Sequence, residues 1–242
     1  MSTPMLMTRR VAQLVGGLFL YGFAIAMMIR AALGISPWDV LSQGVVLHTG
    51  LNYAIVTNVI GAIVLLLWIP IRQKPGIGTV VNVLTIGPSI EVGLWLLPEV
   101  DELVPRVLLL AGGLVLLAIA TGLYIGARFG PGPRDGLMTG IHKRTGWPIW
   151  IVRTGIEVTV LIIGWLLGGN VGIGTLAFAL LIGPMVNVTL PLFRVPEAGE
   201  RQPTRAEVSR VARDRRDSHW RVQISRFPLH DVSTRKRKEV TT

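Results

Sequence analysis

The sequence feature that most constrains the fold of this chain is an internal repeat, in which two segments match each other without a gap at an offset of 96 residues. Residues 34–88 and 130–184 share 20 identities in 55 aligned positions, where so apolar a composition gives about a tenth by chance. A duplication of this length predicts two halves with the same order of elements. The identities include Gly34, Pro37, Asp39, Leu41, Gly44 and Gly50 with Gly130, Pro133, Asp135, Leu137, Gly140 and Gly146, then 76–79 with 172–175, and 86–88 with 182–184.

Composition and the length of the apolar runs indicate a membrane protein. Hydrophobic residues make up 50% of the 242 residues and charged residues only 16%, and the mean hydropathy is +0.56. Because about 20 residues of helix cross the hydrocarbon core of a bilayer, these runs predict six transmembrane helices. The predicted spans are 11–33, 51–71, 77–97, 107–127, 147–167 and 171–193.

The predicted fold is an all-α, polytopic membrane helix bundle of two three-helix repeats, 8–98 and 105–194. Because each repeat has an odd number of spans, the second enters the membrane from the opposite side, and the repeats are inverted. Basic residues give an independent test, since they stay in the cytoplasmic loops. They occur before span one, after spans two and four, and after span six, at Arg9, Arg10, Arg72, Lys74, Lys143, Arg144 and Arg194. This pattern predicts that both termini are cytoplasmic.

The first apolar run could also be a cleaved signal peptide, because it follows two arginines. Its Gly-Gly-Leu sequence at 16–18 returns at 112–114, however, which favours the first helix of repeat one. The chain contains no cysteine, and this excludes disulfides, thiolate metal sites and a cysteine nucleophile.

The last segment, 195–242, differs in composition from the rest. From Arg194 onward, 49 residues hold 13 of the 24 Lys+Arg and 7 of the 14 Asp+Glu, so more than half of the net charge of +10 lies here (13 − 7 = +6). No apolar face is large enough for a core, which predicts a basic, disordered cytoplasmic tail. The alternatives are contact with anionic lipid or with a cytoplasmic protein. Nucleic-acid binding is not expected, because no recognition module accompanies the charge.

Each repeat contains a short helix, predicted at 36–49 and 133–145, which is too short to cross the membrane and is therefore interfacial or re-entrant. Pro37 and Pro133 suit the first helical position, Ser36 suits the N-cap, and Asp39 and Asp135 can accept from free amides. Both aspartates could be helix caps alone. If the helix starts line a cavity instead, these carboxylates favour a cationic or neutral solute over an anion.

Paired prolines mark the third span of each repeat. Pro88 and Pro184 follow Gly87 and Gly183 in the middle of their spans. A proline removes one helical hydrogen bond and frees a carbonyl at membrane depth. Such paired breaks in matching helices predict a binding site at the interface of the repeats.

Several polar side chains within the spans are further candidates for a substrate or ion site. Glu91 needs a partner or water at membrane depth, and could bind a proton or cation with Arg153 as counter-charge. Arg153 and Glu157 are four residues apart and share a helix face, so they can pair with each other or with Glu91 in an internal network that only fixes packing. Asn58, Asn82 and Asn187 are expected to make hydrogen bonds between helices.

A glycine followed by Ser-Pro-Trp-Asp-Val-Leu, the Gly-Pro-Gly-Pro-Arg-Asp-Gly-Leu-Met-x-Gly sequence of the second copy, and Gly-x-Gly-Thr with a later Ile-Gly-Pro resemble the YczE branch of the YitT/YczE family of bacterial integral membrane proteins. The resemblance covers 8–194 and leaves the tail unexplained. It implies a multi-spanning protein of the bacterial plasma membrane. It implies no substrate or catalytic residue.

Three classes of function follow from these features. The favoured class is a permease for a small cationic or neutral solute, or a proton-coupled one, and six spans could require a homodimer to enclose the pathway. The alternative is a regulatory or scaffold protein that acts through its tail. An enzyme is not expected, because neither His48 nor His142 stands in a metal-ligand or nucleophile spacing, and no cofactor is predicted.

Overall fold

The structure is a computed structural model that describes residues 3–195, and these residues are all-helical, as predicted. The expectations for the tail concern 196–242 and lie outside the described residues. The helices are α1 (Thr3–Ala31), α2 (Pro37–Thr49), α3 (Tyr53–Leu66), α4 (Trp68–Ile71), α5 (Ile77–Leu96), α6 (Leu103–Gly126), α7 (Pro133–Thr145), α8 (Ile149–Leu166) and α9 (Ile173–Phe193).

Within the described residues, six segments are long and apolar enough to cross a membrane, and they match the six predicted spans. They are Met5–Ala31, Tyr53–Ile71, Ile77–Leu96, Leu103–Gly126, Ile149–Leu166 and Ile173–Phe193. The second span consists of α3 and α4, which a turn at Leu67 separates. Pro70 explains the interruption, because a proline cannot donate to the carbonyl four residues earlier.

The first helix begins earlier than the apolar run predicts, at Thr3 rather than near residue 11. The added turns end with two basic residues, of which the second is Arg10. The Arg10 guanidinium donates from Nε to the Ala127 carbonyl at 2.9 Å and from Nη2 to the Arg128 carbonyl at 2.9 Å. A positive charge on carbonyls at the end of α6 stabilises both helices, and hydropathy alone cannot predict such a contact.

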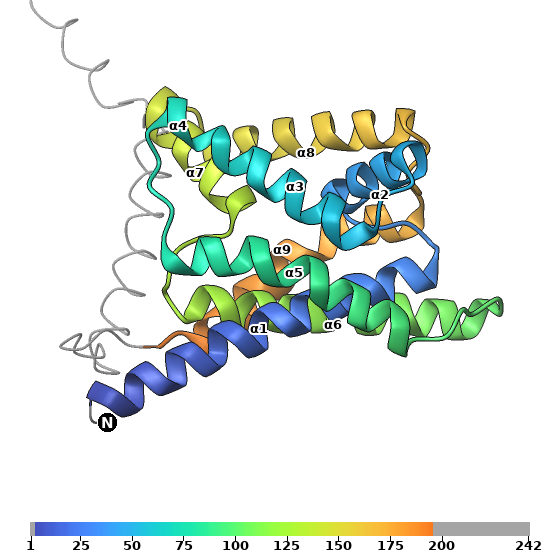
Figure 1. The fold of residues 1–242 in the computed structure, drawn as a ribbon, viewed down its shortest axis with the longest axis horizontal. Helices are drawn as coiled ribbons and strands as arrows, with labels where there is room; N and C mark the ends of the chain where they lie inside the picture. Colours follow the sequence, from blue (N-terminus) through green and yellow to red (C-terminus); the bar gives the residue numbers. More distant parts are fainter. Residues whose placement is uncertain (1–2, 196–242) are drawn as a thin grey trace, which may run out of the picture. The chain divides into compact units, whose positions relative to one another are not determined.

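The same contact recurs 96 residues later. Arg106 donates from Nε to Ala31 and from Nη2 to Ala32, both at 2.8 Å, at the end of α1. The start of α1 therefore lies beside the end of α6, and the start of α6 lies beside the end of α1. These two helices run antiparallel (Figure 1). We call the two ends of the bundle the Arg10 end and the Arg106 end.

Glycines join the two repeats in a second pair of equivalent contacts. The Gly78 N–H donates to the Phe129 carbonyl at 2.9 Å, and the Gly174 N–H donates to the Leu33 carbonyl at 2.7 Å. A Cβ atom on Gly76 would lie 2.4 Å from that Phe129 oxygen. Only a residue without a side chain fits there, so these glycines allow the two repeats to approach closely.

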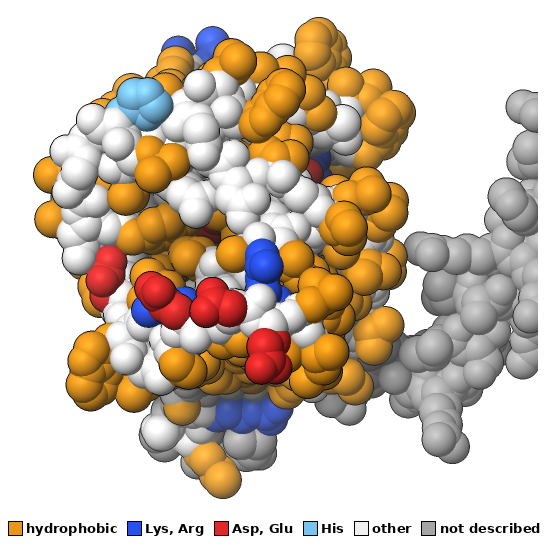
Figure 2. Space-filling view, turned by 90° about the vertical axis from the view of Figure 1, so that its right-hand side faces the viewer, with side chains coloured by type: hydrophobic (Ala, Val, Ile, Leu, Met, Phe, Trp, Pro, Cys, Tyr) orange, Lys and Arg blue, Asp and Glu red, His pale blue; other side chains and the backbone are white. Residues whose placement is uncertain are grey.

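The short helices have the predicted bounds to within one residue, and each ends at a glycine with positive φ, Gly50 (67°) and Gly146 (73°). α2 lies toward the right-hand, Arg106 end of the bundle in Figure 1 and α7 toward the left-hand, Arg10 end. Each begins among buried residues and ends at an exposed surface. Figure 2 shows the Arg106 end, where acidic side chains gather; Glu99, Asp101 and Glu102 are exposed there.

The helix breaks expected at the paired prolines do not occur. α5 continues through Pro88, and α9 continues through Pro184 and Pro191. A proline interrupts one hydrogen bond of the ladder but leaves the helical φ unchanged, so a helix held by its neighbours can continue.

Candidate functional site

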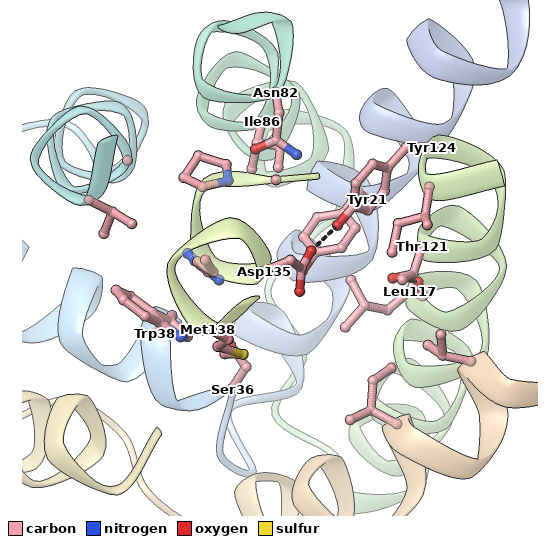
Figure 3. A pocket seen from close by; sticks show the side chains of 18 of the residues that line it. Tyr21, Ser36, Trp38, Asn82, Ile86, Leu117, Thr121, Tyr124, Asp135 and Met138 are labelled. Atoms are coloured by element: carbon pink, nitrogen blue, oxygen red, sulfur yellow. Dashed lines mark hydrogen bonds between the residues drawn. The ribbon is translucent and has the colours of Figure 1, made fainter. Parts of the chain in front are cut away.

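A cavity of about 330 Å³ lies where the two repeats meet. Its wall includes residues from both repeats and from every described helix except α4 (Figure 3). Its volume is at the lower end of the range for small-molecule sites. The polar residues in the wall are Tyr21, Ser36, Trp38, Thr57, Asn82, Thr121, Tyr124, Arg134, Asp135, Arg153, Glu157 and Asn187.

The starts of α2 and α7 meet beside this cavity. Nη2 of Arg134, in the first turn of α7, lies 3.8 Å from Oδ1 of Asp39, in the first turn of α2. The Asp39 side chain is buried and accepts a short hydrogen bond from the Ser36 hydroxyl. Ser36 was expected to cap the helix through its side chain, but it makes no cap hydrogen bond because its hydroxyl is turned to this carboxylate. The repeated aspartates thus stand where two positive helix ends converge.

Asp135, the counterpart of Asp39, has a different partner. The Tyr124 hydroxyl donates to Asp135 Oδ2 at 2.6 Å, and the rings of Tyr21 and Tyr124 meet edge to face at 5.8 Å (Figure 3). A Cβ atom built on Gly132 would lie within 3.3 Å of Asn82 Nδ2 and 3.5 Å of Asp135 Oδ2. Polar atoms from three helices therefore converge on the start of α7.

Arg134 and Trp38 occupy equivalent positions of the two repeats and contact each other. The guanidinium carbon of Arg134 lies 5.1 Å from the centroid of the Trp38 ring. This stacking holds the cation at the wall of the cavity. The Trp38 indole N–H and the Thr57 hydroxyl are buried in the same wall and make no hydrogen bond within the described structure.

Arg153 and Glu157 form the (i, i+4) pair that their spacing predicts, with Nε and Oε1 at 3.0 Å. The side chains are 46% and 19% exposed, and both line the cavity. Asn187, on α9, also lines it and is exposed. These residues therefore lie where the cavity reaches the surface.

Glu91 and Asn58 lie outside the cavity wall. Glu91 Oε1 accepts from the Ala54 N–H at 3.3 Å, in the first turn of α3. The expected alternative, in which Glu91 joins Arg153 and Glu157, is not realised, because Glu91 is engaged at the start of α3 while Arg153 pairs within α8. Asn58 Oδ1 is buried without a hydrogen bond, and a Cβ atom on Gly87 would lie 2.4 Å from it.

The structure thus places five predicted site residues in the cavity wall: Asn82, Asp135, Arg153, Glu157 and Asn187. Asp39 lies behind them, against Arg134. Sequence reasoning missed the tyrosines, because Tyr21 and Tyr124 have no tyrosine counterparts and lie on apolar spans. Trp38 and Arg134 could have been found, since they adjoin the repeated aspartates.

The two repeats close around the cavity to different extents. In repeat one, α3 packs along α5, and a Cβ atom on Gly61 would lie 3.8 Å from Val83 Cβ. The corresponding helices of repeat two, α8 and α9, have no comparable interface among the described residues. A Cβ atom on Gly183, the counterpart of Gly87, would meet no atom within 4 Å. The cavity is therefore closed between α3 and α5 and open between α8 and α9.

The opening lies toward the Arg10 end. Asn187 stands in the second half of α9, whose last residue, Phe193, accepts from Gln13 Nε2 near the start of α1 at 3.3 Å. The α3–α5 contact extends to the other end, where the Ala54 N–H meets Glu91. Among residues 3–195, no group of three His, Cys, Asp or Glu side chains is close enough to hold a metal ion.

Comparison with known proteins agrees with a multi-pass membrane protein. The chain is 35% identical over 177 residues to the uncharacterized membrane protein YczE of Bacillus subtilis (72% of this chain, 82% of the relative). It is 34% identical over 189 residues to an uncharacterized protein of Haemophilus influenzae (78% and 87%), and 27% identical over 180 residues to the uncharacterized protein YyaS of Bacillus subtilis (73% and 90%). No solved structure matches.

The YczE part of the resemblance is thereby confirmed, whereas the link to YitT stays a prediction. Residues 8–191 match a family described as a family of unknown function, DUF6198. The chain belongs to this DUF6198 family, together with YczE-like membrane proteins.

Proposed function

We propose that this protein is a carrier that moves a small cationic or neutral solute across the membrane by opening its two repeats in turn. The observation that supports this proposal is the difference around the cavity: the α3–α5 interface is closed, and the equivalent α8–α9 interface is open. A site between inverted repeats that opens to one side at a time is the usual arrangement of secondary transporters.

The antiparallel packing of α1 and α6 and the exchanged arginine contacts support the inverted arrangement of the repeats. In an inverted pair, exchanging the conformations of the two repeats would close α8 against α9 and open α3 from α5. The cavity would then open toward the Arg106 end. The same site would thus face each side of the membrane in turn.

The expected topology assigns these sides. Basic loop residues and bacterial relatives support a bacterial plasma membrane with both termini in the cytoplasm. The Arg10 end is then cytoplasmic, and the structure corresponds to an inward-open carrier. The basic tail would follow α9 into the cytoplasm.

The charges of the cavity support a cationic or neutral solute. In the wall, Asp135 and Glu157 balance Arg134 and Arg153, and Asp39 behind the wall, 3.8 Å from Arg134, adds one negative charge when all are ionised. An anion would lose its hydration on entering the cavity and would then be repelled by this excess negative charge.

A flux assay in liposomes tests the proposal. Purified protein would be given a panel of small labelled cationic and neutral solutes, and exchange across the membrane would be measured. We expect Asp135→Asn to abolish exchange and Asp101→Asn, on an exposed loop, to leave it unchanged. Deletion of 200–242 should not alter exchange. Loss of activity on this deletion, with Asp135→Asn active, would instead support the regulatory role of the tail.

A further inference from the structure

Two consecutive residues in the cavity wall carry opposite charges and have hydrogen-bonding capacity that the protein does not use. They are Arg134 and Asp135, at the start of α7. The Arg134 guanidinium has five N–H donors but makes no hydrogen bond within residues 3–195, and its nearest carboxylate oxygen, on Asp39, is 3.8 Å away. A donor group of this kind beside a cavity is typical of a binding site for an acceptor.

A second donor without a partner lies in the wall of the same cavity. The Trp38 indole N–H is buried without a partner in the described structure, and the residue is only 6% exposed. Indole can donate and cannot accept, so only an acceptor oxygen satisfies it. Because Arg134 stacks on the Trp38 ring, the two donors belong to one part of the wall.

Asp135, in contrast, has acceptor positions that need a donor or a cation. Its carboxylate is half-buried and accepts one hydrogen bond in the described structure, from Tyr124, although a carboxylate has about four acceptor positions. No cation of the described residues pairs with it. In Figure 3 this side chain extends from α7 toward Tyr124 and Tyr21.

We infer that the cavity binds a small zwitterion of the amino-acid type, with its ammonium group on Asp135 and its carboxylate on Arg134 and the Trp38 N–H. This inference rests on the proposed function and names the substrate class of the same site. The apolar residues of the wall, Ile86, Leu117 and Ile182, would contact a short apolar side chain. The volume of about 330 Å³ favours a small molecule.

Simpler ligands fit less well. A bare organic cation would pair with Asp135 but leave Arg134 and the Trp38 N–H without an acceptor. A simple carboxylate would satisfy those donors but face the unpaired negative charge of Asp135. Only a ligand with both groups compensates both sides of the wall, because an unmet buried polar group costs binding energy.

Calorimetric titration of the full-length protein in phosphatidylglycerol nanodiscs tests the inference with three probes of similar size: alanine, ethylamine and propionate. We expect alanine to bind at least tenfold more tightly than either of the other two. Equal affinity for alanine and ethylamine, or no binding of alanine, would overturn the inference.

Charge-removing variants then assign the two subsites. Arg134→Gln should remove the preference for alanine over ethylamine, and Asp135→Asn the preference for alanine over propionate. Lys143→Gln, on the same helix, and Asp101→Asn serve as matched controls and should keep both preferences. A purely structural role for Arg134 and Asp135 would weaken all three probes equally, and this result would contradict the assignment. If Arg134→Gln does not fold, Arg134→Lys should retain the preference in reduced form.

Two further arms separate the alternatives. Phosphatidylethanolamine carries an ammonium and a phosphate, so nanodiscs with and without this lipid distinguish a free zwitterion from a lipid headgroup. Equal alanine binding in both supports the free ligand, and weaker binding with phosphatidylethanolamine overturns it. If the α3–α5 and α8–α9 interfaces alternate but alanine does not bind, the zwitterion inference fails and the carrier proposal stands.

Discussion

The closed side of the cavity, between α3 and α5, and the open side, between α8 and α9, have the same origin in the repeat but different side chains. Gly61 on the closed side is replaced by Glu157 on the open side, which pairs with Arg153. A Cβ atom on Gly61 would be in ordinary contact with Val83 Cγ1 and Cγ2 at 3.4 Å, so α3 and α5 pack against each other here without a charged side chain between them. The duplicated backbone thus provides two equivalent interfaces, with a glycine on the closed one and a charged pair on the open one.

A second pair of equivalent interfaces, between α8 and α2 and between α4 and α7, also differs in its side chains. α8 approaches α2 through Gly164, where a Cβ atom would lie 2.5 Å from the Leu41 amide nitrogen. Its counterpart, Trp68, instead packs on Gly136 of α7 and donates from Nε1 to the Pro133 carbonyl at 3.0 Å. One short helix is therefore held by backbone contact and the other by a large side chain.

Gly164→Ala is expected to have the largest effect on stability. The atoms that a Cβ would meet belong to the backbone of α2 and cannot move without displacing that helix. We expect a loss of about 1–3 kcal/mol, measured as a lower thermal unfolding temperature in detergent. Gly155→Ala is the matched control on α8, since a Cβ there meets no atom within 4 Å, and it should be neutral or stabilising. Equal losses for both variants would refute the backbone contact.

Gly87→Ala and Gly183→Ala compare the closed and open sides directly. A Cβ on Gly87 would lie 2.6 Å from the Ala54 carbonyl oxygen, so we expect a loss of about 1–2 kcal/mol. Gly183→Ala should leave the stability of this conformation unchanged, because its surroundings are empty. Thermal unfolding of the two variants side by side measures the difference. A larger loss for Gly183→Ala would contradict the open α8–α9 interface.

The two helix-end arginines should differ by the smallest amount. Arg10→Gln and Arg106→Gln each remove a charge that binds two carbonyls, but only Arg10 also lies over an aromatic ring, that of Phe129, at 4.8 Å. We expect Arg10→Gln to cost more by about 0.5–1 kcal/mol. Thermal unfolding of the two variants at two salt concentrations measures this difference in stability. Equal costs would show that the ring contributes nothing.

Much of this architecture can be predicted from the sequence, because span length, the repeat and the glycine and proline positions are local signals. The short helices and the (i, i+4) pair of Arg153 and Glu157 follow from spacing alone. The partners of Asp39 and Asp135 do not, since Arg134 and Tyr124 reach them through the packing of separate helices. The uninterrupted helices at Pro88 and Pro184 also depend on tertiary contacts.

The open and closed interfaces could not be predicted either. Twenty identities over 55 positions predict that the repeats are alike. The difference arises from a few substitutions, such as Glu157 for Gly61, whose effect depends on which helices meet. Identity between repeats therefore predicts the common fold, and the unmatched residues determine how far each half closes.

Cysteine cross-linking tests whether the α3–α5 and α8–α9 interfaces alternate, and the chain suits it because it has no cysteine of its own. The Gly61→Cys/Val83→Cys pair reports the closed side, where a Cβ atom on Gly61 would lie 3.8 Å from Val83 Cβ, a separation that suits a disulfide. The Thr154→Cys/Gly183→Cys pair reports the open side, because these residues are the counterparts of Asn58 and Gly87, which meet on the closed side.

The carrier proposal predicts that each pair forms a disulfide in the membrane, the Gly61/Val83 pair faster. In the protein with all four cysteines, whichever disulfide forms first should prevent the other. The reason is that the carrier proposal has one interface closed while the other is open. Simultaneous formation of both disulfides, or a Thr154/Gly183 pair that never forms while Gly61/Val83 is reduced, would contradict the alternation of the two repeats.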